Sequence, residues 1–199
     1  MAKAGSKGVA RPERERQILG LAIEEFGRRG YARASVADIA SRAGISKPLI
    51  YGYFGSKDGL AAACADHVGR LLVDEVTAAQ TPAAPGGRAL DTLSAIFTVL
   101  ADCPQAWSVL YDVTLPAVGE VHATARRHRA QLARLGAAGT AEVLSGAGDH
   151  DPLDHDLLGA IWQYTVTAVV RWWLDHPDQP PAAMVERCAR ILAAIGTIP

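Results

Sequence analysis

Four side chains suited to binding phosphate lie between positions 47 and 57. Lys47 and Lys57 are cationic, and Tyr51 and Tyr53 carry hydroxyl groups. Lysine and tyrosine are among the side chains with which proteins hold the phosphate oxygens of DNA. Lys57 also lies at the predicted start of a helix, whose free amide groups attract phosphate. These residue types predict a surface that binds a polyanion.

The neighbours of these four side chains are suited to contacting bases. We expect Pro48 and Leu49 to touch base edges or thymine methyl groups in a major groove. Gly52 has no side chain, so it allows the helix to approach the DNA closely but recognises no base itself. Tyr51 and Tyr53 cannot both face the same direction on a helix, because only residues three or four apart share a face. One of them can instead cover the core of a small domain with its hydroxyl exposed.

Two short helices must position these side chains. Ser35–Asp38 resembles a capping box, in which the serine oxygen accepts an amide and the third residue after it is acidic. Ala43–Ile45 ends that helix, since a glycine permits a tight turn with positive φ. Ser46 is the natural N-cap of the next helix, and Pro48 lies in its first turn, where a missing N–H costs nothing. The pair predicts a helix-turn-helix, whose second helix enters the major groove.

The rest of the chain also has helical periodicity. Apolar residues at Ile18, Ala22 and Phe26 indicate an amphipathic helix from residue 11 to a C-cap at Gly30. A longer helix is expected from Lys57 to about Ala79. The later helices are expected near Leu90–Leu100, Trp107–Tyr111, Val118–Leu144, His155–Asp175 and Ala182–Ala194. No alternating strand pattern occurs, so the fold class is all-α.

Charge is distributed unevenly along the chain. Residues 1–60 contain 11 Lys or Arg against 6 Asp or Glu, whereas residues 61–199 contain 9 against 15. A basic end on an acidic protein favours a nucleic-acid partner, although a solvated surface gives the same imbalance. The longest apolar segment near the C-terminus, Val166–Leu174, is far shorter than the roughly 20 residues of a membrane span. With no signal-peptide pattern in Met1–Ala10, we expect a cytoplasmic protein with no membrane partner.

Residues 11–60 resemble the DNA-binding domain of the TetR family of bacterial transcriptional repressors. The resemblance rests on an ordered series: the Ile18/Ala22/Phe26 helix with Gly30-Tyr31, then Ser35–Ala40, Ala43–Lys47, Ile50–Phe54 and Ser56–Leu60. It implies that Ser35, Lys47, Tyr51, Tyr53 and Lys57 contact the DNA backbone. The helix caps Ser35 and Ser46 would keep their structural role beside any DNA contact. Gly52 departs from the larger polar or aromatic residue common at its position in the family.

The resemblance also implies a ligand-responsive homodimer. Four segments are expected. They are a flexible basic arm at 1–10, a helix-turn-helix domain at 11–56, a connecting helix at 57–80, and a helical effector-binding and dimerisation domain at 81–199, which opens with the linker-like Thr81–Gly87. The effector, a small molecule of unknown identity, is expected to contact aromatic side chains. The candidates are Phe97, Trp107, Tyr111, Trp162 and Tyr164. The expected dimer interface comprises Leu157, Ile161, Val169, Val185, Cys188, Ile191, Leu192 and Ile195.

Two other functions compete with a repressor. Asp149–Asp156 is rich in Asp and His, the residues of a metal-dependent enzyme, but it contains a proline and lies between helices, where Asp154 can cap the next one. A solvated loop is therefore preferred, and no enzyme activity, metal or cofactor is expected. The three cysteines form no C-x-x-C pair and are expected to be inert buried thiols. A helical dimeric adaptor without DNA affinity is the second alternative.

Overall fold

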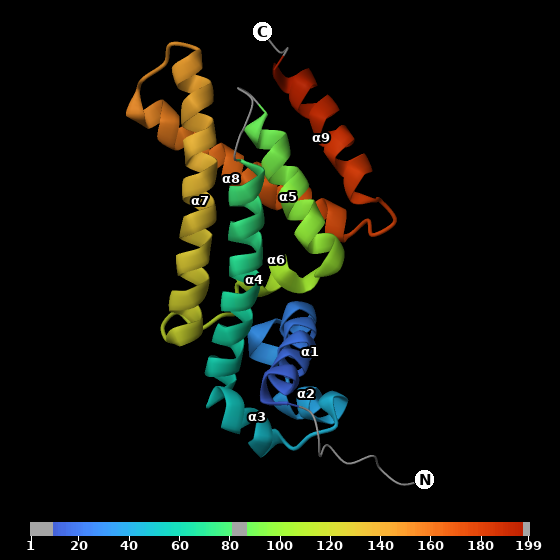
Figure 1. The fold of residues 1–199 in the computed structure, drawn as a ribbon. Coiled ribbons are helices and arrows are strands. Elements are labelled where there is room, and N and C mark those ends of the chain that lie inside the picture. Colours follow the sequence, from blue (N-terminus) through green and yellow to red (C-terminus); the bar gives the residue numbers. More distant parts are fainter. Residues whose placement is uncertain (1–9, 81–86, 197–199) are drawn as a thin grey trace. The chain divides into compact units, whose positions relative to one another are not determined.

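The computed structural model describes residues 10–80 and 87–196, and within these ranges every regular element is a helix. Figure 1 shows the helices in chain order. They are α1 (Arg11–Arg33), α2 (Val36–Ala43), α3 (Lys47–Phe54), α4 (Lys57–Ala79), α5 (Arg88–Asp102), α6 (Gln105–Leu110), α7 (Glu120–Gly146), α8 (Pro152–Leu174) and α9 (Pro181–Gly196). The all-α prediction is confirmed. None of these helices is long and apolar enough to cross a bilayer.

The chain forms two compact units. The first contains residues up to Gly69 together with Gln105–His128, and the second contains Arg70–Pro104 and the chain from Arg129 onward. Both α4 and α7 run through the boundary, so each unit contains part of each helix. Residues 105–128, expected in the effector-binding domain, thus share a compact unit with the helix-turn-helix.

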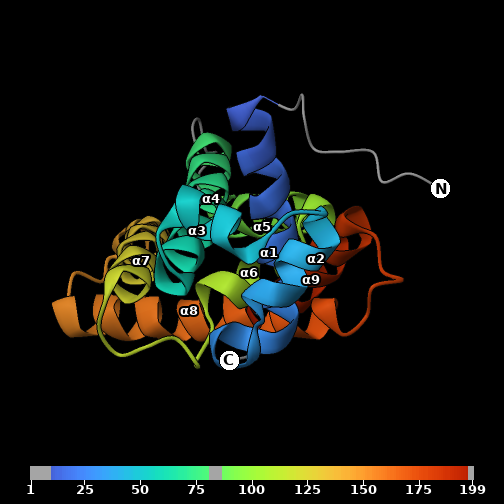
Figure 2. The ribbon, with the colours of Figure 1, turned by 90° about the horizontal axis from the view of Figure 1, so that it is seen from below.

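The first unit is built around the apolar stripes that the sequence predicts. Ile18 and Ala22 of α1, Ile39 of α2, and Ile50 of α3 are fully buried. Helix α2 packs against both α1 and α3, and Figure 2 shows these three helices together, while α6 packs on α1. An eight-residue helix such as α3 is not stable alone. Its burial against neighbours is what keeps it folded.

Helix α1 is kinked where the sequence predicts its end. Gly30 has φ 72° and ψ 160°, a conformation that only glycine adopts without strain, and the helix resumes for one short turn to Arg33. The freed backbone groups find partners in a distant loop. The Tyr31 N–H donates to Asp112 Oδ2 at 2.5 Å, and the Ala32 N–H donates to Thr114 Oγ1 at 3.2 Å. The loop after α6 therefore holds the end of α1.

The second unit has its own apolar core. Leu72 and Val76 of α4, Leu93 and Phe97 of α5, and Val170 of α8 are buried. The Phe97 ring meets the Trp173 ring edge-on, with centroids 5.0 Å apart, and α9 packs against α5.

Most predicted helix limits agree with the structure, with one corrected cap. Asp151, rather than Asp154, caps α8, because its Oδ1 accepts the Leu153 N–H at 2.9 Å. Pro152 follows in the first turn, the position that proline favours. Asp154 lies within that turn instead. The arm at 1–10, except Ala10, and the linker at 81–87, except Gly87, fall outside the described residues.

Candidate nucleic-acid interface and ligand cavity

The turn between α2 and α3 has the geometry that its sequence predicts. Ser35 Oγ accepts the Asp38 N–H at 3.2 Å, and Ser46 Oγ accepts the Leu49 N–H at 3.4 Å, so both serines are helix N-caps. Gly44 is left-handed, with φ 65° and ψ 29°, and the Ile45 N–H then donates to Ala40 O at 3.0 Å. These local bonds fix where α3 begins.

Gly44→Ala should lower the free energy of unfolding by about 1 kcal/mol, since a left-handed residue with a Cβ is strained. A Cβ there meets no atom within 4 Å, so the loss would come from the backbone alone. Gly20→Ala is the matched control, because a Cβ there is equally unobstructed and Gly20 lies inside α1. That control should stabilise the protein by about 0.5–1 kcal/mol. Urea denaturation of both variants measures the difference, and equal effects at the two sites would contradict this account.

The outer side of α3 presents the side chains expected to meet DNA. Lys47, Pro48, Leu49 and Gly52 are exposed, whereas Ile50 on the same helix is fully buried. Helix α3 thus has a buried apolar anchor at Ile50 and an exposed set that contains four of its predicted contact residues.

Each of the two α3 tyrosines lies beside a cation. Lys47 Nζ is 5.5 Å from the Tyr51 ring centroid, and the Arg11 guanidinium carbon is 5.2 Å from that of Tyr53. Both rings are half-buried. Cation–π contact keeps positive charge beside each ring. Arg11 was not among the predicted contacts, because it lies at the start of α1 and nothing local in the sequence connects it to Tyr53.

The start of α4 is the second candidate phosphate site, but some of its donors already have partners within the protein. Ser56 Oγ accepts the Gly59 N–H at 2.9 Å, so that amide is already satisfied. Lys57 Nζ lies 4.8 Å from the Tyr31 ring centroid and donates to Ala32 O at 3.5 Å. Burial, and then the charge of Asp58, raise the pKa of Tyr31. Lys57 is half-buried, and its ammonium rests on the end of α1.

Acidic residues on this unit hold the helices together. Buried Glu25 accepts the Ser35 N–H at 3.1 Å and pairs with Arg29 at 3.3 Å. Arg29 also pairs with Asp38 at 3.4 Å, and Glu24 pairs with Arg42. Glu25 therefore links α1 to the N-cap of α2, which orients the helix-turn-helix.

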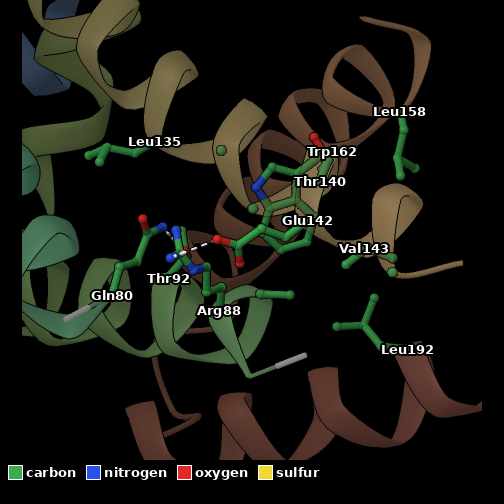
Figure 3. A pocket seen from close by; sticks show the side chains of 14 residues that line it. Gln80, Arg88, Thr92, Leu135, Thr140, Glu142, Val143, Leu158, Trp162 and Leu192 are labelled. Atoms are coloured by element: carbon green, nitrogen blue, oxygen red, sulfur yellow. Dashed lines mark hydrogen bonds and ion pairs between the residues drawn. The ribbon is translucent and has the colours of Figure 1, made fainter. Parts of the chain in front are cut away.

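A cavity of about 720 Å³ lies within the second unit (Figure 3). It is lined by Gln80, Arg88, Ala89, Thr92, Leu135, Gly136, Gly139, Thr140, Glu142, Val143, Gly146, Leu158, Trp162 and Leu192. Arg88 pairs with Glu142 at 2.9 Å, and Gln80 Nε2 donates to Thr92 Oγ1 at 2.8 Å. Its size is within the usual range for small-molecule sites, about 300–1,000 Å³.

One of the five aromatic effector candidates lines this cavity. Trp162 does so, while Phe97 is buried against Trp173. Trp107 and Tyr111 stack at 4.2 Å in the first unit, and Tyr164 is 78% exposed. The α7 side of the cavity was not predicted. Its signal in the sequence is Leu135, Gly136, Gly139 and Val143, which share one helical face where glycines leave space.

The predicted dimer residues fall into two groups. Leu157 and Ile161 of α8 are 59% and 51% exposed, and Ile191 and Ile195 of α9 are 52% and 58% exposed. The others are less accessible: Val169 and Val185 are half-buried, Cys188 is buried, and Leu192 lines the cavity. Leu153, Tyr164 and Trp172 add to the exposed apolar side chains of α8. Contact of any of these residues with a second copy stays a prediction.

The Asp149–Asp156 segment serves local structure. Asp149 Oδ1 accepts the Asp151 N–H at 2.9 Å, and the His155 ring lies 3.1 Å from Asp149 O. The charge of Asp149 is the main cause that raises the pKa of Asp154. Within the described ranges, no group of three or more His, Cys, Asp or Glu side chains is arranged to hold a metal ion.

Comparison with known proteins identifies the first unit. Residues 18–64 match the family described as "Bacterial regulatory proteins, tetR family". The chain is similar to the HTH-type transcriptional regulator BetI of Brucella anthropi, with 41% identity over 68 residues. Those residues cover 34% of this chain and 35% of that protein, so the chain spans about a third of its relative's length in this match.

Solved structures resemble a larger part of the chain. A TetR-like transcriptional regulator from Rhodococcus sp. RHA1 has a TM-score of 0.71 and 26% identity, covering 90% of this chain and 93% of that one. FadR from Bacillus subtilis in complex with stearoyl-CoA has a TM-score of 0.66, covers 86% and 95%, and is 18% identical, a likeness of fold alone. The α2–α3 pair has the geometry of a helix-turn-helix, and residues 18–64, which contain it, match the DNA-binding part of the TetR family of bacterial regulatory proteins. The fold of a TetR-like regulator extends over most of the chain.

Proposed function

We propose that this protein is a ligand-responsive repressor whose homodimer binds a palindromic DNA operator and leaves it when a small-molecule effector binds. The observation that carries the proposal is α3, a helix fixed by Ile50 that exposes Lys47, Pro48 and Leu49. Surfaces of this kind read base edges while neighbouring groups hold phosphates. In this role the protein works in the cytoplasm.

We assign phosphate contacts to the polar side chains around α3. They are Ser35, Ser46, Lys47, Tyr51, Tyr53 and Lys57, and Arg11 joins them through its contact with Tyr53. Pro48 and Leu49 would face the bases, with Gly52 allowing close approach. For Lys57 to reach a phosphate, its ammonium must leave the Tyr31 ring, which costs little because the amine is not held by an ion pair among the described residues.

The exposed apolar residues of α8 and α9 support a homodimer. Leu157, Ile161, Ile191 and Ile195 form surfaces of the kind that mark protein interfaces. A dimer also fits the task, because two recognition helices must lie about 34–36 Å apart to enter successive major grooves. Four helices, α8 and α9 from each copy, would form this interface.

The cavity in the second unit is the proposed effector site. Its lining includes α7 residues 135–146, and α7 continues without a break into the unit that contains α3. Helix α4 makes the same crossing. An effector that binds one dimer geometry more tightly shifts the population toward it, with coupling of about 1–3 kcal/mol. The FadR complex with stearoyl-CoA supports a ligand site in a protein of this fold.

An electrophoretic mobility shift with the DNA upstream of the protein's own gene tests the proposal. We expect a retarded complex at low salt that persists against excess unrelated duplex. The absence of a shift on this DNA and on palindromic duplexes would favour an adaptor role. In that case Lys47→Ala and Tyr53→Ala would leave the protein's function unchanged.

A further inference from the structure

The lining of the cavity is apolar except for one charged pair and a few neutral polar groups. Leucine, valine, alanine, glycine and tryptophan supply most of it, and Arg88 and Glu142 are its only charged members among the described residues. A ligand that fills this space must therefore be largely apolar. The charge that it tolerates depends on Arg88 and Glu142.

Arg88 has an unused hydrogen-bond donor. One of its terminal nitrogens pairs with Glu142 Oε1 at 2.9 Å, but its Nε is buried and has no hydrogen-bond partner among the described residues. Buried donors are nearly always satisfied by protein, water or ligand. An acceptor on a bound molecule would satisfy this one.

The two partners differ in what it costs to separate them. The Glu142 side chain is 57% exposed, so water solvates it readily after it leaves Arg88. The Arg88 side chain is 29% exposed, so losing its anion leaves a charge in a less solvated place. Arg88 is also the first residue of α5, whose N-terminal end carries partial positive charge. An incoming anion can therefore pair with Arg88 in place of Glu142 at small cost. An incoming cation would pair with Glu142 and leave the less exposed Arg88 without its anion.

We propose that the cavity binds an apolar molecule with one anionic group, a carboxylate or a phosphate, that pairs with Arg88 in place of Glu142. This inference rests on the proposed effector site and names the chemistry of its ligand. The apolar part of the ligand would lie along Leu135, Val143 and Trp162.

Isothermal titration calorimetry of the intact protein with decanoate, decan-1-ol and decylamine tests the charge preference, because the three probes share one chain length. Decanoate should bind about ten- to a hundredfold more tightly than decan-1-ol, as expected for hydrogen bonds to a charged group. Decylamine should bind least tightly. Decyl phosphate distinguishes the two anions: binding at least as tight as that of decanoate would assign the site to phosphates, and weaker binding would assign it to carboxylates.

Variants separate a ligand contact from a structural role. Arg88→Gln should remove the preference for decanoate and leave decan-1-ol binding nearly unchanged. Glu142→Gln should instead tighten decanoate binding several-fold, because the competing carboxylate is gone; a merely structural ion pair would weaken binding in both variants. Arg134→Gln, an exposed cation of α7 outside the lining, is the matched control and should change neither probe.

The location is tested by Gly139→Leu. A Cβ at Gly139 lies 3.7 Å from Arg88 Cβ and Cδ, an ordinary contact, so the helix accepts a side chain that then fills the cavity. All three probes should bind at least tenfold more weakly to this variant. Equal affinity for decanoate and decan-1-ol, binding of neither, or a preference that survives Arg88→Gln would overturn the proposal.

These titrations contain no DNA, so their outcome is independent of operator binding. If the protein shifts its upstream DNA but shows no preference for decanoate, the proposed function is supported and this ligand class is contradicted. If the protein prefers decanoate through Arg88 but binds no duplex, the proposed ligand class is supported and the proposed repressor function is contradicted.

Discussion

A protein carrying Leu157→Glu and Ile161→Glu should be monomeric and should bind its operator more than a hundredfold more weakly. Both side chains are more than half exposed in the single chain, so the substitutions leave each folded copy intact. In the proposed interface, however, each would bury an unpaired carboxylate at a cost of several kcal/mol. A loss of about 3 kcal/mol already corresponds to a hundredfold change in affinity. A single copy also presents only one recognition helix to DNA.

Sedimentation velocity and a mobility shift at the same protein concentration measure both effects. Val118→Glu is the matched control, because it puts the same charge on an exposed valine outside α8 and α9. We expect that variant to stay dimeric and to bind normally. If the double variant sediments as the unmodified protein does, the α8–α9 interface is wrong.

Lys47→Ala should weaken binding to every duplex by about tenfold or more and reduce its salt dependence. The side chain is exposed and lies near the Tyr51 ring, so its removal should not disturb the fold. Each phosphate contact contributes about 0.9 to the slope of log K against log salt, and a dimer has two copies of Lys47. The slope should therefore become shallower by about two units.

Fluorescence anisotropy across roughly 50 to 200 mM salt measures this slope. Lys47→Arg keeps the charge and should retain most of the slope, and Arg134→Ala removes a cation far along α7 and should leave it unchanged. A Lys47→Ala loss confined to one operator sequence, with the slope intact, would mean that Lys47 reads a base and does not bind a phosphate.

The helix-turn-helix could be predicted because its determinants are local. Ser35 and Ser46 each bond an amide three residues ahead, and Gly44 sets the turn through its own φ. Such features are encoded within a few residues, so their pattern identifies them without knowledge of the fold. The DNA-contact roles of Lys47 and the two tyrosines are implied by the family resemblance and stay predictions.

The remaining features depend on residues far apart in the chain. Asp112 satisfies the Tyr31 amide across 81 positions, and Arg11 reaches Tyr53 only in the folded state. The cavity has Gly136 and Gly139 in its lining, whereas the residue type that predicts a ligand site from sequence is a large aromatic. The N-cap of α8 is Asp151 and not the predicted Asp154, because the helix begins at Pro152. The error is a shift of three residues within one polar loop.

Selection of bound duplexes from a random pool tests the central claim most directly. If exposed α3 faces in a pair of copies bind DNA, the enriched sequences should contain a palindrome whose half-sites are centred about 10–10.5 base pairs, or a multiple of this, apart. A pool that shows no enrichment after repeated rounds at low salt, or that enriches single half-sites without symmetry, would contradict the claim.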